Sequence, residues 1–217
     1  MNKWSGKEDL RFIDYQFMRI FEDLCEAIRF VEDPVPDEIF HKVNSLEKLK
    51  VYIKSLKEWF ELSGDKSDEQ LDEVYEVARE WLYGRRLSFD YLVDSPDCFL
   101  IRNGDQLHIY WIAEHQDEQG IPFWEESKAT FSCNYQEFIS ALIESFKAFG
   151  LAMRKQISGL FENTPEKLII DREQIMVNQF QYEEWITELE NKRLFYADSP
   201  DWNNVVKQID EILRNKS

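Results

Sequence analysis

Three features of the sequence predict an α+β fold, mostly helical with a small antiparallel β-sheet. Apolar residues recur at helical spacing near both ends of the 217-residue chain. Between about residues 86 and 133 the spacing changes to the alternation that is typical of strands. Asn103-Gly104 lies between two apolar segments of this region, which is a strong short-range signal for a β-hairpin. We therefore expect helices, then a sheet, then helices again.

Amphipathic helices are expected over about residues 8–32, 37–62 and 67–83 in the first part of the chain. Pro34 and Pro36 end the first of these helices, because proline cannot continue a helix interior. Gly64 is suited to end the second helix, and Ser67 is suited to cap the third.

The central hairpin is expected to have Asn103-Gly104 as its two-residue turn, which pairs Arg102 with Asp105. Because side chains alternate between faces, five apolar residues share the face that we expect to be the core: Cys98, Leu100, Leu107, Ile109 and Trp111. Four residues share the opposite face: Phe99, Ile101, His108 and Tyr110. Further strands are expected over Leu87–Tyr91 and over Pro122–Cys133.

The remainder of the chain is expected to be helical. A helix over about residues 135–158 has Asn134 as its N-cap and Glu137 in a capping-box position. Thr164-Pro165 indicates a further helix start, and helical spacing continues over about residues 171–194. Ser199-Pro200-Asp201-Trp202 begins the last helix.

Composition favours one globular domain over residues 1–217, since 43% of residues are hydrophobic and 15% are aromatic. It has three expected parts: a helical lobe over about 8–83, a hairpin with a long helix over about 86–160, and C-terminal helices over about 165–214. Cys25, Cys98 and Cys133 lie far apart among apolar residues, as reduced core thiols do. The N-terminus lacks the apolar core of a signal peptide and no apolar run approaches a membrane span, so a cytoplasmic protein is expected.

Several classes of site are disfavoured by residue spacing. The seven glycines are never closer than Gly150 and Gly159, which excludes the P-loop, the dinucleotide fingerprint and the nucleophile elbow. Glu38 and His41 have the spacing of a di-iron pair, but no second pair exists. Gln70 replaces the glycine that a calcium loop starting at Asp65 needs. We therefore expect no metal, no cofactor and no catalytic residue.

One cysteine and one histidine could form a nucleophilic pair, Cys98 with His108. The expected hairpin places them on opposite faces of the sheet, where they cannot form a hydrogen bond. A buried core thiol is the favoured interpretation of Cys98.

Charge gives the clearest indication of function. The chain has 43 Asp and Glu against 26 Lys and Arg, a net charge of −17, which repels nucleic acid and anionic membranes and favours a basic protein partner. Residues 114–126 contain five acids and no Lys or Arg: Glu114, Asp117, Glu118, Glu125 and Glu126. Phe123 and Trp124 lie among these acids and could act as interface anchors. The alternative is a solubilising loop with a core tryptophan.

The order of several short segments resembles a bacterial family catalogued only as a domain of unknown function. The segments are Phe12 to Gln16, Ile20 to Leu24, Pro34 to Asp37, Arg102 to Asp105, His108 to Trp111, Gly120 to Trp124, and Asp201-Trp202. The resemblance extends from Phe12 to about Leu213 and is carried by core, turn and cap residues. It allows the role of an immunity protein, which neutralises a toxin.

We therefore expect an acidic, non-enzymatic binding protein, most concretely an immunity protein for a basic toxin domain. The expected contacts are the five acids of residues 114–126, with Phe123 or Trp124 as anchor. An adaptor or regulatory module in bacterial defence or signalling, with the helical face as its docking surface, is one alternative. A hydrolase that uses carboxylates outside any standard motif is another. The sequence leaves the oligomeric state open.

Overall fold

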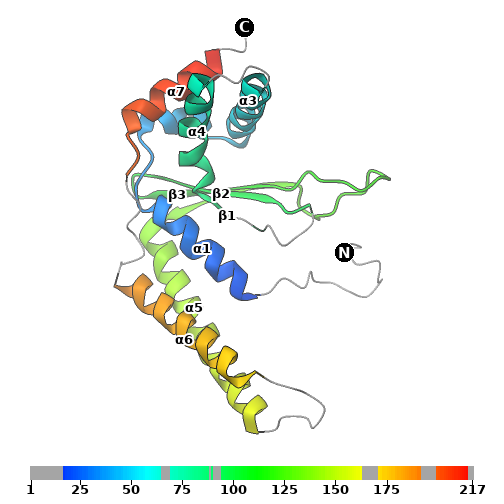
Figure 1. Cartoon of the computed structure of the whole chain (residues 1–217), viewed down its shortest axis with the longest axis vertical. Coiled ribbons are helices and arrows are strands. Elements are labelled where there is room, and N and C mark those ends of the chain that lie inside the picture. Colours follow the sequence, from blue (N-terminus) through cyan, green and yellow to red (C-terminus); the bar gives the residue numbers. More distant parts are fainter. Residues whose placement is uncertain are drawn as a thin grey trace. The chain divides into compact units, whose positions relative to one another are not determined.

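The computed structural model describes residues 17–64, 69–87, 89, 94–162, 171–191 and 199–214. It confirms the mostly helical α+β class with a small antiparallel sheet (Figure 1). The chain forms two compact units, one of residues 1–133 with 197–217 and one of residues 134–196. We call them unit 1 and unit 2.

Unit 1 contains most of the secondary structure. Its helices are α1 (Phe17–Val31), α2 (Asp37–Val43), α3 (Leu46–Gly64), α4 (Glu69–Tyr83) and α7 (Trp202–Arg214). Its sheet has the order β1 (Arg86–Leu87), β2 (Asp97–Asn103), β3 (Gln106–Ile112) and β4 (Lys128–Asn134), and β4 ends at the boundary with unit 2. Figure 1 shows α3, α4 and α7 on one side of this sheet and α1 on the other.

Helices cover both faces of the sheet, and this corrects the expected position of the core. Phe99, Ile101 and Tyr110, expected on the outer face, are fully buried and join the main apolar cluster with α2, α3, α4 and α7. Cys98 and Leu100 are also buried, and α1 contacts β1 and β2. The alternation of side chains correctly divides the hairpin residues between the two faces of the sheet. It cannot identify a single core face here, because helices cover both faces.

The hairpin turn lies one residue later than expected, so each pairing partner is displaced by two residues, and Arg102 pairs with Leu107 instead of Asp105. Asn103 pairs with Gln106, so Gly104-Asp105 forms the turn, with Gly104 at a φ of +55°. The side chain of Asn103 donates to the Asp37 carboxylate at 2.8 Å and to the Val35 carbonyl at 3.0 Å. These contacts fix Asn103 as the last strand residue, while glycine takes the left-handed position without strain. The two face sets are unchanged by this displacement.

The expected helix over 37–62 is two helices, α2 and α3, because the chain breaks at Asn44-Ser45. The Ser45 hydroxyl accepts from the backbone N–H of Lys48 at 3.3 Å, and the Lys48 ammonium donates to the Asn44 side chain at 3.0 Å. Polar side chains that bind nearby backbone favour helix ends over interiors, which explains the break.

The strand expected over Leu87–Tyr91 is described only in part: β1 is Arg86–Leu87, and residues 88, 90 and 91 lie outside the described part. The strand expected over Pro122–Cys133 begins later in the structure. Pro122 forms only an isolated bridge with Gln116, and β4 begins at Lys128. The expected helix starts at Ser67 and Thr164-Pro165 also lie outside the described residues.

Unit 2 is a helical hairpin of α5 (Tyr135–Glu162) and α6 (Arg172–Glu190). The expected cap is confirmed, since the Asn134 side chain accepts from the N–H groups of Gln136 and Glu137 at 2.9 and 3.2 Å. The helices approach closely at Gly150, where an added Cβ would lie 2.9 Å from the Tyr182 ring. Within the described residues, no helix has both the length and the apolar character needed to span a membrane.

Candidate functional site

The acidic segment, residues 113–127, connects β3 to β4 in unit 1. At its base the Ala113 N–H donates to the Ser127 carbonyl at 2.7 Å. Five residues further into each strand, the Nδ1 atom of His108 lies 2.9 Å from the Ser132 hydroxyl. Both contacts fit one antiparallel register between β3 and β4. The acidic segment therefore begins and ends on two strands that are paired with each other.

The tip of the acidic segment is held by Asp117. One oxygen of its carboxylate accepts from the N–H groups of Gln119 and Ile121 at 2.9 and 2.8 Å, and its carbonyl accepts from Gly120 at 2.9 Å. Gly120 has a φ of +77°, which favours glycine. Asp117, expected as a partner contact, therefore has a local role in shaping the turn.

The aromatic residues hold the segment against the sheet. Trp124 is half-buried, and its ring meets the Trp111 ring edge-on at a centroid distance of 5.5 Å. The Trp124 indole N–H donates to the Asp94 carbonyl, and the Trp111 indole N–H donates to the Glu126 carbonyl, both at 3.0 Å. Phe123 is also half-buried, and its N–H donates to the His115 carbonyl at 3.2 Å. The Trp124 side chain therefore packs within the protein and holds the acidic segment in place.

The remaining acids of the segment differ in their partners. Glu114 forms an ion pair with Lys50 of α3. Glu118, Glu125 and Glu126 are exposed and form no ion pair within the part of the chain that the structure describes. The segment therefore presents three available carboxylates on a backbone fixed at its base, at its tip and by two indole groups.

The structure describes most of the other residues that the sequence singled out. Cys98 lies on the sheet face opposite His108, and burial raises the pKa of its thiol to about 12, so it stays protonated. This confirms the core-thiol interpretation. Glu38 and His41 are both exposed on α2. The described residues contain no cluster of three potential metal ligands, and the loop that begins at Asp65 lies outside them.

A buried cation lies at a second place in unit 1. Arg85, which is 0% exposed, follows α4, and its guanidinium donates to the carbonyls of Trp81 at 2.6 Å and Asp33 at 2.9 Å. It also lies over the Trp202 ring at 5.2 Å. Burial lowers the pKa of Arg85 to about 10, while the negative charge of Asp33 opposes this change. The group therefore remains charged near neutral pH.

Asp33 connects Arg85 to the start of α7. Its carboxylate accepts from the Trp202 indole N–H at 2.9 Å and from the Ser199 hydroxyl at 2.5 Å. We call Asp33, Arg85, Ser199 and Trp202 the Arg85 junction. Asp201, the next acid, caps α7 by accepting from the N–H groups of Asn203 and Asn204 at 3.1 and 3.3 Å.

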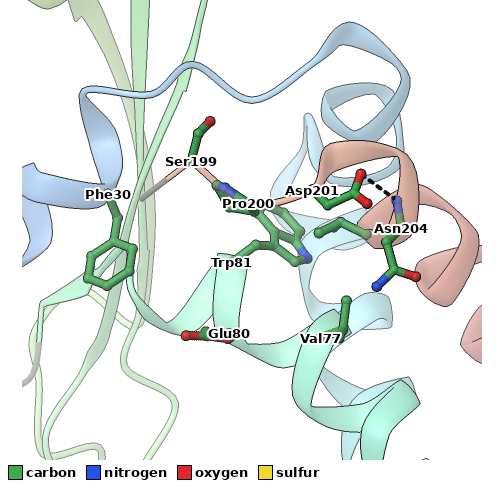
Figure 2. A pocket seen from close by; sticks show the side chains of 9 residues that line it. Phe30, Val77, Glu80, Trp81, Ser199, Pro200, Asp201 and Asn204 are labelled. Atoms are coloured by element: carbon green, nitrogen blue, oxygen red, sulfur yellow. Dashed lines mark hydrogen bonds between the residues drawn. The ribbon is translucent and has the colours of Figure 1, made fainter. Parts of the chain in front are cut away.

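A pocket of about 270 Å³ opens beside this junction, between α4 and the start of α7 (Figure 2). Its lining residues are Phe30, Val77, Glu80, Trp81, Ser199, Pro200, Asp201, Asn204 and Val205. Figure 2 shows Pro200 beside Trp81, with Asp201 and Asn204 to one side and Glu80 below. We call it the α4–α7 pocket.

Sequence reasoning identified the acids of the acidic segment but missed both the junction and the pocket. The helix start at Ser199-Pro200-Asp201-Trp202 was a visible signal. Nothing in the spacing of the residues indicated that it would pack against Asp33 and Arg85, more than 100 residues earlier in the chain.

The model of a family described as "Family of unknown function (DUF5984)" matches residues 1–208. No curated protein and no solved structure matches the chain.

Proposed function

Since the chain belongs to DUF5984, a family of unknown function, we propose from charge and geometry that it is a non-enzymatic binding protein for a basic protein partner. The observation that carries this proposal is the acidic segment. Its carboxylates Glu118, Glu125 and Glu126 are exposed and available, while hydrogen bonds fix the backbone that presents them.

Preorganisation is what distinguishes this segment from a merely solubilising loop. A binding loop that is already ordered loses less conformational entropy when its partner docks. The net charge of −17 adds a long-range attraction for a cationic partner and raises the association rate. Half-buried Phe123 adds apolar area beside the carboxylates.

In its most concrete form, the proposal is an immunity protein that covers the basic cleft of a toxin domain. A carboxylate surface competes directly with the anionic substrate of such a cleft. The alternative, an adaptor or regulatory module that docks through its helical face, would not protect a cell.

The experiment uses a cationic protein encoded beside the gene and measures its affinity by calorimetry between about 50 and 300 mM salt. The test variant is Glu118→Gln/Glu125→Gln/Glu126→Gln. We expect it to weaken binding about tenfold or more at low salt and to flatten the salt dependence.

The matched control removes the same charge from other exposed sites in unit 1, as Glu47→Gln/Glu61→Gln/Asp72→Asn. An equal loss of affinity in both variants would show that net charge, and not the acidic segment, recognises the partner. Growth protection upon co-expression with the toxin domain then separates an immunity protein from an adaptor.

A further inference from the structure

We propose that the α4–α7 pocket binds the alkyl guanidinium or alkyl ammonium group of a ligand. It lies on elements other than the acidic segment, so this site goes beyond the function proposed above. The proposal rests on three properties of the pocket: its charge, its apolar walls and its size.

The charge of the lining is entirely negative. Glu80 on α4 and Asp201 at the start of α7 are both exposed acids, and none of the described lining residues is Lys or Arg. Arg85, in the adjacent junction, is fully buried and lies near the negative charge of Asp33. A cation that enters the pocket therefore meets two carboxylates, of which Asp201 also accepts, through its Oδ1 atom, the two N–H groups that it caps on α7.

The walls suit an aliphatic stem. Phe30, Val77, Pro200 and Val205 line the pocket with apolar atoms, and the largely buried Trp81 contributes to its base. Arginine and lysine side chains bury their methylene groups against apolar surface and keep the charged group at a polar rim. Glu80 and Asp201 supply that rim on two sides of Trp81, and Asn204 lies beside Asp201 (Figure 2).

The size of the pocket selects a small group. Sites for drug-sized ligands and cofactors generally enclose about 300–1,000 Å³, and this pocket has about 270 Å³. It accommodates a single side chain or a small amine more readily than a nucleotide. The shared chemistry is a cationic group on an alkyl chain, supplied either by a free metabolite or by an exposed side chain of a polypeptide.

The experiment titrates the full chain with three probes and follows backbone and indole N–H shifts by NMR. Agmatine represents the free small cation, and the peptide Gly-Arg-Gly represents a side chain. Gly-citrulline-Gly has nearly the same shape as the second probe and the same charged termini, but its side chain is neutral. We expect dissociation constants on the order of 1 mM for both cations, with shifts at Trp81 and Asn204, and no saturable shift with the citrulline peptide.

Two variants remove the charges and spare the fold. Glu80→Gln alters an exposed side chain, and Asp201→Asn keeps an oxygen that can cap α7. We expect each variant to weaken binding several-fold and the double variant to abolish it. Asp72→Asn, which removes an exposed acid of α4 outside the pocket, should leave binding unchanged.

Equal binding of the citrulline peptide, or undiminished binding by the double variant, would overturn the proposal. So would the absence of shifts at about 10 mM of either cation. If Gly-Arg-Gly binds more tightly than agmatine, the source is a polypeptide; the reverse order indicates a metabolite. Neutralising Glu118, Glu125 and Glu126 should not affect these titrations, so the two proposals can fail separately.

Discussion

The Arg85 junction and the acidic segment both contain charged side chains in unit 1, but the environments of these charges are opposite. In the junction, the buried Arg85 donates to two carbonyls and has the Asp33 carboxylate nearby. In the acidic segment, Glu118, Glu125 and Glu126 face solvent without an ion pair among the described residues.

The difference follows from the cost of removing charge from water. A buried charge must be compensated inside the protein, because an unpaired one destabilises the fold by several kcal/mol. An exposed carboxylate remains hydrated, and its contribution to stability is small. The charges of the junction therefore serve the fold, whereas those of the acidic segment are available to a partner.

The largest effect is expected from Asp33→Ala. The substitution removes the acceptor of the Trp202 and Ser199 groups and leaves Arg85 without its nearby carboxylate. We expect a loss of about 2–3 kcal/mol in the free energy of unfolding, measured by urea denaturation. Asp37→Ala is the matched control, since its exposed carboxylate accepts one side-chain bond from Asn103, and it should cost less than about 1 kcal/mol.

Gly84→Ala tests the packing next to the junction. An added Cβ would lie 2.6–2.8 Å from atoms of the Phe30 ring, so α1 or the α4–β1 turn must shift. We expect a loss of about 1–3 kcal/mol in thermal or urea unfolding. Gly159→Ala, in α5, meets no atom and should instead stabilise by about 0.5–1 kcal/mol. The same sign for both substitutions would contradict the packing argument.

Trp124→Ala probes how the acidic segment is held. It removes the edge-on contact with Trp111 and the hydrogen bond to the Asp94 carbonyl. Hydrogen exchange at the Ile121 and Phe123 amides should accelerate about tenfold, because these amides are protected by bonds within the segment. Trp124→Phe keeps an aromatic ring and should have a smaller effect. Unchanged exchange in Trp124→Ala would mean that the indole does not order the segment.

The same contrast explains what the sequence could predict. Local signals were sufficient for most of the described helices, though not for the break between α2 and α3, and also for Asn134 as a cap and for the division of β2 and β3 into two faces. Local signals failed where a contact between residues far apart in the sequence determines the structure. Asn103 is held in its strand by Asp37 and Val35, and both faces of the sheet are covered by helices. The partners of Arg85 come from three separate parts of the chain, so no local pattern could have indicated them.

The candidate site was predicted in composition but not in geometry. The five acids and two aromatics were visible as a cluster, yet the sequence did not distinguish Asp117 and Glu114 from the others. That distinction depends on the turn at Gly120 and on the position of Lys50 in α3. Backbone geometry therefore divides one apparent cluster into residues that build the segment and residues that it presents.

The smallest effect, and the finest test of this division, is expected at Asp117. Asp117→Asn keeps a side-chain oxygen for the N–H groups of Gln119 and Ile121 and should change stability by less than about 0.5 kcal/mol. Asp117→Ala removes the acceptor and should cost about 1 kcal/mol by urea denaturation. If the Asn variant is as destabilised as the Ala variant, the negative charge itself holds the turn. The charge of Asp117 would then stabilise the fold, as that of Asp33 does. The contrast would therefore hold between individual residues, because the acidic segment would contain both kinds of charge.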